Sequence, residues 1–137
     1  MSTANIALAQ RIMSRFAMDN WYELLHDDIV LEFPYAKTLG MPERVAGKAV
    51  AVEYLSGVMK HIPGLAFRNV RIEAMADPDS VLVQYDGGCT LPSGAVYDQR
   101  YITVQKFKDG RMILFREYWN PVAVTAAFGT DLEAAFS

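Results

Sequence analysis

A carboxylate between two aromatic residues is the feature of this sequence best suited to chemistry. Glu117 lies in the stretch Phe115-Arg116-Glu117-Tyr118-Trp119, with Phe115 two residues before it and Trp119 two residues after it. In a strand these three side chains point to the same face. A carboxylate on an apolar face is costly to ionise, so its pKa rises towards neutrality, as suits a general acid or base. The alternative is an ion pair with an arginine, within the chain or across a subunit interface.

Tyrosines and one histidine are the next candidates. Tyr101 and Tyr85 occupy alternating positions of two expected strands and could donate to a substrate oxygen or enolate. As an alternative, they are core tyrosines whose hydroxyls are satisfied by the backbone. His61 is expected at the C-terminal end of a helix, where it is either a surface residue or, if it faces inward, a proton shuttle. The candidate substrate-binding wall consists of Trp119, Phe115, Phe33, Tyr35, Tyr54, Tyr85, Thr103 and Trp21.

Composition and charge exclude several classes of function. The 137 residues suit a single domain spanning 1–137, and the net charge of −3 comes from interleaved acids and bases. This pattern does not provide the basic stripe of a nucleic-acid-binding protein. The apolar runs are shorter than the roughly 20 residues of a membrane span, and no signal peptide is evident. One cysteine, Cys89, excludes an internal disulfide and fits a reducing cytoplasm.

The same residues argue against bound metals and cofactors. The two histidines, His26 and His61, are far apart in the sequence and no cluster of cysteine and histidine accompanies them. A metal site is therefore not expected. The chain also lacks a glycine-rich phosphate loop, so we expect a protein that works without a cofactor.

Helical patterns dominate the first half of the chain. Apolar spacing predicts a helix over residues 4–18, and the capping residues Asp19 and Asn20 predict a second, short helix. A strand is expected over 29–35 and a loop over 37–45. A third helix is expected to follow Gly47 and to end before residue 62.

The second half consists of consecutive strands. They are expected over residues 66–76, 80–91, 96–108 and 112–119, and the turn Lys108-Asp109-Gly110 is the clearest hairpin signal. Helices followed by a meander favour an α+β fold in which a curved antiparallel sheet and the helices enclose an apolar cavity. Both faces of the last hairpin are partly apolar and carry large apolar side chains. A patch with Ile102, Val104, Leu114 and Tyr118 therefore predicts a two-fold homodimer through the sheet.

Several local strings resemble the SnoaL-like group of the nuclear-transport-factor-2-like superfamily, the cystatin-like α+β cone. The first half is similar in layout, from the strand Asp28-Ile-Val-Leu-Glu-Phe-Pro-Tyr35 to Ala46-Gly47-Lys48 at the start of a helix. The second half is most similar to the phenazine-biosynthesis A/B proteins. The strings that carry this resemblance are Asn69-Val70-Arg71-Ile72, Asp77-Pro78, Tyr85-Asp86-Gly87-Gly88 and, most specific, Arg116-Glu117-Tyr118-Trp119-Asn120-Pro121.

The resemblance implies a cone with an inner pocket and places Phe115, Glu117 and Trp119 on the pocket side. It also implies that Glu117 matches the glutamate that phenazine proteins use, whereas Lys48 stands where those proteins carry a histidine. The related ketosteroid isomerases have aspartates at positions that correspond to Phe33 and lie near Thr103, so steroid isomerisation is not expected. The superfamily holds isomerases, cyclases, dehydratases, epoxide hydrolases and binding proteins, and fold alone does not choose among them.

From these observations we expect a cofactor-independent isomerase, cyclase or lyase for a small cyclic or aromatic molecule. Glu117 would move a proton, Tyr101 and Tyr85 would hold the substrate oxygen, and aromatic residues would form the wall. A ligand-binding protein without turnover, or a protein–protein module that uses the face of the sheet, remains the alternative.

Overall fold

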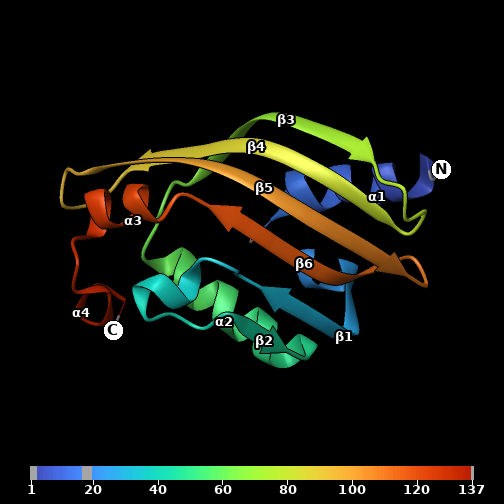
Figure 1. Ribbon diagram of the computed structural model, residues 1–137, viewed down its shortest axis with the longest axis horizontal. Coiled ribbons are helices and arrows are strands. Elements are labelled where there is room, and N and C mark those ends of the chain that lie inside the picture. The colour runs from blue at the N-terminus through green and yellow to red at the C-terminus, as the bar shows by residue number, and fades with distance from the viewer. Residues whose placement is uncertain (1–2, 17–19, 137) are drawn as a thin grey trace.

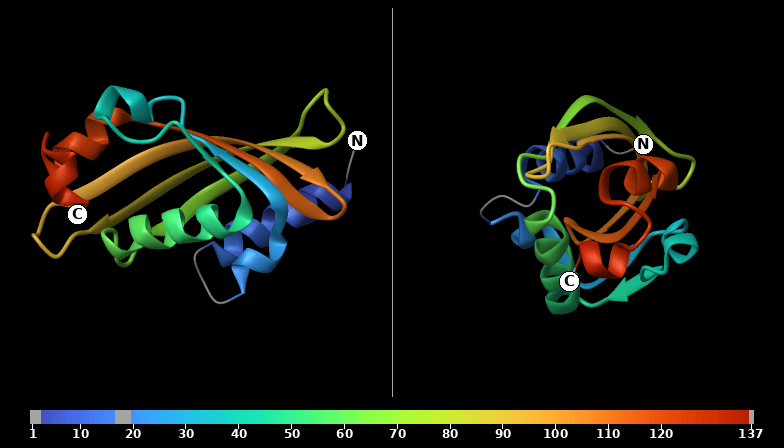
Figure 2. Two further views of the ribbon diagram at one scale, coloured as in Figure 1. Left: turned by 90° about the horizontal axis from the view of Figure 1, so that it is seen from below. Right: turned by 90° about the vertical axis from the view of Figure 1, so that its left-hand side faces the viewer.

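One curved sheet and a set of helices on its concave side make up the molecule (Figure 1). The structure is a computed structural model that describes residues 3–16 and 20–136. Asp19 and the end of the predicted first helix, residues 17–18, lie outside the described residues. The α+β class and the curved sheet are confirmed, and the sheet wraps around the helices as a cone (Figure 2).

The sheet has six strands in the spatial order β2-β1-β6-β5-β4-β3. Their bounds are β1 Leu25–Glu32, β2 Arg44–Ala46, β3 Ala66–Ala74, β4 Ser80–Thr90, β5 Val96–Lys108 and β6 Arg111–Trp119. The four strands of the second half form the predicted antiparallel meander. Asp109 and Gly110 both adopt positive φ, of 54° and 75°, as a tight hairpin turn requires. β1, however, runs parallel to β6, so the expectation of a purely antiparallel sheet was wrong at this junction.

Two predictions in the first half need correction. β1 begins at Leu25 rather than at residue 29, because the polar residues 26–28 that resemble a turn occupy an irregular stretch of the strand before Val30. The expected loop over 37–45 contains the 3-10 turn η2, Ala36–Leu39, and part of the edge strand β2. β2 has only three residues and pairs with β1 at the edge of the sheet. A strand this short contains too few residues to show an alternating hydrophobic pattern in the sequence.

The helices α1, Thr3–Arg15, and α2, Lys48–Lys60, lie on the concave side of the sheet (Figure 2). The buried face of α1 carries Ala9, Ile12 and Met13, which contact the inner core, and α1 packs against β3 and β4. α2 packs against β1 and buries Ala51 and Leu55. The predicted second helix is the 3-10 turn η1, Trp21–Leu24.

Two further helices were not predicted from the sequence. α3, Pro121–Phe128, begins where Asn120 Oδ1 accepts a hydrogen bond of 2.9 Å from the Val122 N–H. α4, Leu132–Ala135, begins at Asp131, whose carboxylate accepts one of 3.1 Å from Ala134 N–H. Both helices lie over one end of the cone (Figure 2). They separate the interior of the cone from solvent at that end.

The inner face of β5 is unusually polar for a core strand. Every second residue from Tyr97 to Phe107 is buried, and the residues between them are exposed or half-buried. Three of the buried side chains are polar, namely Gln99, Thr103 and Gln105, and each is 0% exposed. Because buried polar groups need hydrogen-bond partners, this strand requires a network inside the cone.

Candidate functional site

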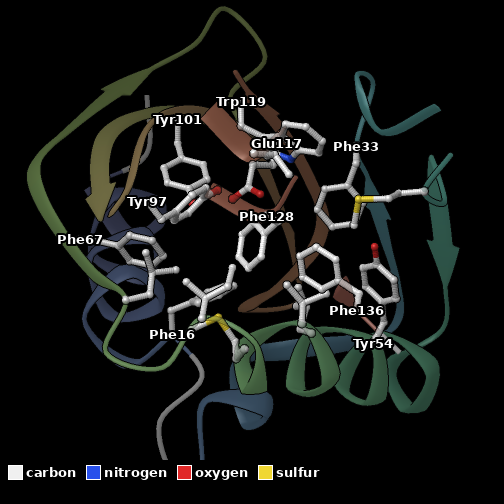
Figure 3. A pocket seen from close by; sticks show the side chains of 17 residues that line it. Phe16, Phe33, Tyr54, Phe67, Tyr97, Tyr101, Glu117, Trp119, Phe128 and Phe136 are labelled. Carbon is white, nitrogen blue, oxygen red and sulfur yellow. The ribbon is translucent and has the colours of Figure 1, made fainter. Parts of the chain in front are cut away.

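A cavity of about 80 Å³ lies between the inner face of the sheet and α2, and Phe128 and Phe136 line it from the C-terminal segment (Figure 3). Its walls are aromatic and aliphatic. Glu117 is the only acidic or basic side chain among the described residues that line it. The predicted apolar pocket is therefore present. It is much smaller than the roughly 300–1,000 Å³ of a typical ligand pocket.

Glu117 points its carboxylate into this cavity from β6 (Figure 3). The hydroxyl of Tyr85, on β4, donates a hydrogen bond of 2.8 Å to Glu117 Oε2. Removal from water raises the pKa of Glu117 to about 7, although the Tyr85 hydrogen bond acts in the opposite direction. No described basic residue forms an ion pair with Glu117. The carboxyl can therefore both take up and release a proton near pH 7.

A pair of tyrosines faces the same cavity from β5. The hydroxyls of Tyr97 and Tyr101 lie 3.1 Å apart, so one of them donates to the other. Burial raises the pKa of both phenols, which keeps them protonated as hydrogen-bond donors near neutrality. Gln99 donates from Nε2 to the Tyr97 hydroxyl at 3.3 Å. Because one hydroxyl hydrogen is used within the pair, the second can be donated to a ligand oxygen.

Gln99 also ties this tyrosine pair to the end of β6. Its Nε2 donates to the Asn120 carbonyl at 2.9 Å, and its Oε1 accepts from the Asn120 N–H at 2.7 Å. The amide is thus satisfied on both sides where the chain leaves the sheet for α3. This arrangement holds Tyr97 in place and couples it to the helix that covers the cavity.

The wall opposite the tyrosine pair is aromatic. Trp119 and Phe33 lie beside Glu117, and the ring of Tyr54 lies 5.8 Å from that of Phe33 (Figure 3). Burial and the Glu117 carboxylate both raise the pKa of Tyr54. From the C-terminal segment, Phe128 and Phe136 enter the cavity with their ring centres 4.8 Å apart. The walls on this side of the cavity are therefore apolar and aromatic.

Five of the eleven predicted site residues line the cavity, and the other six lie outside its lining. Glu117, Tyr101, Trp119, Phe33 and Tyr54 are wall residues.

Four residues that were expected in the substrate-binding wall lie in the core instead. Phe115 is buried behind the wall, with its ring 5.9 Å from that of Phe16. Trp21 is buried against the same Phe16 ring at 5.3 Å. Tyr85 and Thr103 are buried in the core next to Glu117 and outside the lining, so neither presents a surface to a ligand.

Tyr35 and His61 are the other two candidates that lie outside the cavity. Tyr35 is 46% exposed, and its ring contacts Tyr118 on the outer side of the sheet at 5.8 Å. His61 lies in an open groove of about 1060 Å³ outside the cavity, where its ring contacts that of Phe136 at 5.2 Å. The groove and the cavity share four wall residues: Met41, Tyr54, Val58 and Phe136. His61 is thus separated from Glu117 by these side chains.

Sequence reasoning missed Tyr97, Gln99, Phe128 and Phe136. The first two could have been found, because they share the strand parity of Tyr101. The two phenylalanines carried no such signal, since α3 and α4 were not predicted. The described residues contain no group of three or more His, Cys, Asp or Glu side chains that could hold a metal ion. No helix in the described ranges is long and apolar enough to cross a membrane.

Comparison with known proteins supports the same fold. A family model described as SnoaL-like domain matches residues 8–115. The uncharacterised protein YesE of Bacillus subtilis is 37% identical over 113 residues, which cover 82% of this chain and 76% of YesE. An uncharacterised PhzA/B-like protein of Pseudomonas aeruginosa is 32% identical over 126 residues, covering 91% and 87%.

Solved structures of other proteins have the same fold as this chain. A Bacillus subtilis protein with a conjectured isomerase activity superposes with a TM-score of 0.83 and 32% identity, over 93% of this chain and 94% of that one. The TerC protein, crystallised together with polyporic acid, has a TM-score of 0.75 and 19% identity, over 91% and 98%, and at this identity shows the fold alone. The family match and the curated relatives cover most of the chain. The chain therefore belongs to the SnoaL-like domain family, within the nuclear-transport-factor-2-like fold.

Proposed function

We propose that this protein is a cofactor-independent enzyme that moves a proton on a small cyclic or aromatic molecule, as an isomerase, cyclase or lyase. The observation that carries the proposal is Glu117. It is an acid with a pKa of about 7 in an apolar cavity, with no described cation beside it and with Tyr85 as its hydrogen-bond donor. Perturbed carboxyls in cavities are common at catalytic sites. A carboxylate needed only for stability would gain nothing from this position.

Each residue has a role in the proposed reaction. The Glu117 carboxylate removes a proton from a carbon next to a carbonyl group, and its acid form returns that proton to another atom of the same molecule. The free hydroxyl hydrogen of the Tyr97–Tyr101 pair stabilises the enolate oxygen that forms in between. Trp119 and Phe33 hold the ring in place beside the carboxylate. Exclusion of water by the C-terminal phenylalanines strengthens both interactions.

The nature of the ligand follows from the wall. A neutral, flat molecule with one oxygen matches an apolar cavity that contains one acid and a tyrosine pair. The solved structure of TerC with polyporic acid, a ligand of that protein, supports a cyclic organic molecule in this fold. Because the cavity is small, such a ligand requires Phe128 and Phe136 to move. The two curated relatives are uncharacterised proteins, so a binding protein without turnover is the competing proposal.

The experiment is a comparison of Glu117→Gln with the parent protein. Cyclic ketones and phenolic compounds are first screened for binding by thermal shift, and bound compounds are then tested for exchange of carbon-bound hydrogen with D₂O. Glu117→Gln is expected to lower the exchange rate by about 10²–10⁴ while binding changes little. Tyr35→Phe, outside the cavity, is the matched control and is expected to leave the rate unchanged. Equal exchange in Glu117→Gln and the parent would overturn the proposal, and binding without exchange in the parent would favour the binding protein.

We also propose that the outer face of the sheet forms a two-fold homodimer and that the protein works in the cytoplasm. Ile102 is 42% exposed and Tyr35 46% exposed on this face, and half-buried Val104, Leu114 and Tyr118 extend the apolar area. Contiguous apolar surface of this kind commonly marks a protein interface. The cytoplasmic assignment rests on the single cysteine, Cys89, which has no disulfide partner within the chain.

A further inference from the structure

A buried glutamine lies behind the tyrosine pair and outside the cavity. Gln99 is on the inner face of β5, is 0% exposed and does not belong to the cavity wall, so it cannot contact a ligand there. Burying an amide costs free energy unless its donors and its acceptor find partners. Gln99 stands between Tyr97 and Tyr101, two residues from each. Its position therefore calls for a role inside the protein that involves this pair.

The partners of the Gln99 amide fix which way it faces. Its Oε1 accepts from two backbone N–H groups, that of Asn120 at 2.7 Å and that of Arg100 at 3.0 Å. Its Nε2 donates to the Asn120 carbonyl at 2.9 Å and to the Tyr97 hydroxyl at 3.3 Å. A backbone N–H can only donate and a carbonyl can only accept, so a flipped amide would lose all three of its bonds to the backbone. Gln99 is therefore held as a donor towards Tyr97.

This fixed amide assigns the direction of the hydrogen bond between the two tyrosines. The hydroxyl oxygens of Tyr97 and Tyr101 are 3.1 Å apart, and by distance alone either could be the donor. A phenol hydroxyl donates one hydrogen and, because it shares a lone pair with its ring, accepts one hydrogen bond well. Gln99 Nε2 already occupies the oxygen of Tyr97 as a donor. The Tyr97 hydrogen is then the one that is donated to Tyr101.

The hydrogen that remains for the cavity is that of Tyr101. Among the described residues Tyr101 has no hydrogen-bond partner besides Tyr97. Its side chain lines the cavity together with that of Glu117 (Figure 3). A hydroxyl that accepts a hydrogen bond becomes a stronger donor, so the series from Gln99 through Tyr97 strengthens the donor at its end. The opposite direction would use the Tyr101 hydrogen within the pair.

We infer that Gln99 is a positioning residue that directs the tyrosine pair, so that Tyr101 donates the hydrogen bond to the substrate oxygen. The inference rests on the proposed function, because that function gives the pair an enolate oxygen to stabilise. It assigns the donor to Tyr101 rather than to Tyr97. It also gives an effect on the reaction to a side chain that does not contact the ligand.

Gln99→Glu separates this effect from the structural role of Gln99 at the junction of β6 and α3. A glutamic acid buried beside a carbonyl stays protonated. One of its oxygens still accepts from the Asn120 N–H, and its hydrogen is donated to the Asn120 carbonyl. The oxygen that replaces Nε2 presents a lone pair to Tyr97, which then donates to it. Tyr101 must now donate to Tyr97, so the variant keeps the junction and removes the donor from the cavity.

Neutron diffraction from crystals exchanged into D₂O tests the directions without a ligand. In the parent protein we expect the hydroxyl deuterium of Tyr97 on the line to Tyr101 and that of Tyr101 in the cavity. In Gln99→Glu we expect the Tyr97 deuterium to face the new acid and the Tyr101 deuterium to face Tyr97. A parent protein in which Tyr101 donates to Tyr97, or a variant with unchanged directions, would overturn the inference.

Hydrogen exchange of cyclohexanone with D₂O tests the effect on the reaction. Gln99→Glu is expected to lower the rate by roughly 10-fold or more, as Tyr101→Phe does, with a melting temperature near that of the parent. Gln99→Met is the comparison, because it unties the junction without reversing the pair. It should lose more stability than Gln99→Glu and less activity. In a Tyr101→Phe background, Gln99→Glu is expected to cause no further loss.

An equal further loss in the Tyr101→Phe background, or rates that follow the melting temperatures of the two Gln99 variants, would show a purely structural role and overturn the inference. If Gln99→Glu does not fold, or cyclohexanone does not exchange, the deuterium positions in the parent protein decide the question. Failure of the proposed function would be seen separately, as unchanged exchange in Glu117→Gln.

Discussion

The hydroxyl of Tyr85 lies 2.8 Å from Oε2 of Glu117, although the two residues belong to strands that are not neighbours. β5 runs between them, and Thr103 of β5 lies directly opposite Glu117 in the register. Tyr85 lies opposite Tyr101, one inward-facing position further along. Strands are spaced about 4.8 Å apart, so only a side chain as long as tyrosine reaches diagonally across one strand. This contact joins the acid of the cavity to a buried core residue of β4.

The stability of the protein should depend on pH through Glu117. Its pKa is raised from 4.5 to about 7 in the folded state, so the folded state holds this proton more tightly than the unfolded state. The contribution to stability is complete below about pH 4.5, decreases as pH rises, and is lost above about pH 7, a difference of up to about 3 kcal/mol. Glu117→Gln removes this dependence. Urea unfolding at pH 5 and pH 8 should show the variant gaining stability relative to the parent at pH 8 only, and an equal difference at both pH values would contradict the expectation.

Gly87 controls the position of Tyr101. A Cβ atom added at Gly87 would lie 2.7 Å from Tyr101 Cε2 and 3.2 Å from Phe67 Cδ1, closer than carbon atoms pack. Gly87→Ala is therefore expected to displace the Tyr101 ring and to destabilise the protein by about 1–3 kcal/mol through overpacking. Gly57→Ala is the control, because nothing lies within 4 Å of its added Cβ. In that α2 position alanine should be neutral or stabilising. Thermal unfolding of both variants measures the difference, and equal melting temperatures would be inconsistent with this close approach.

The two tyrosines of the pair should differ in their effects. The Tyr97 hydroxyl is hydrogen-bonded to both Gln99 and Tyr101, whereas the Tyr101 hydroxyl is hydrogen-bonded to Tyr97. Tyr101→Phe removes the hydroxyl from the cavity without leaving Gln99 unsatisfied, since that amide keeps its bonds to Asn120. It should lower turnover by roughly 10-fold or more, as one lost donor to an oxyanion does, with little loss of stability. Steady-state kinetics with a compound found in the exchange screen tests this, and unchanged kcat would remove Tyr101 from the mechanism.

Phe136 should act as part of the barrier between the cavity and the outer groove. It lines both, and it packs against Phe128 inside and His61 outside. Phe136→Ala is expected to connect the cavity with the outer groove and to speed the association of a ligand with Glu117. The expected loss of stability is about 1–3 kcal/mol, because the Phe136 side chain is only half-buried. Stopped-flow fluorescence of Trp119 on ligand binding measures the rate. The same on-rate in parent and variant would show that entry takes another route.

The proposed dimer predicts a specific sensitivity of the outer sheet face. Ile102→Glu places a charge in the apolar patch on β5, so the variant should be a monomer by light scattering at micromolar concentration while the parent is a dimer. Val50→Glu is the control, because Val50 is 55% exposed on α2, away from the sheet. It should leave the dimer intact. A monomeric parent protein would refute the proposal.

Local sequence patterns were sufficient to predict the strands of the second half, their hairpin at Asp109-Gly110 and the common face of Phe115, Glu117 and Trp119. These features depend on a period of two residues and on turn chemistry, both of which are local. The sequence also marked Glu117 as an acid between Phe115 and Trp119 on one strand face, and the family resemblance placed that face inward.

The side chains that contact Glu117 could not be predicted from local patterns, because they come from strands that are not adjacent in the sequence. Parity assigns a face within one strand, but the contact with Tyr85 depends on register across three strands and on the reach of a phenol. The covering of the cavity by Phe128 and Phe136 depends on where α3 and α4 pack, and their short, weakly periodic sequences do not encode this locally. Tyr35 and Trp21 looked like pocket residues by type, but packing placed one on the outer face and the other in the core. Residue type and spacing therefore name the chemistry available to this chain, and long-range packing selects the groups that can act together.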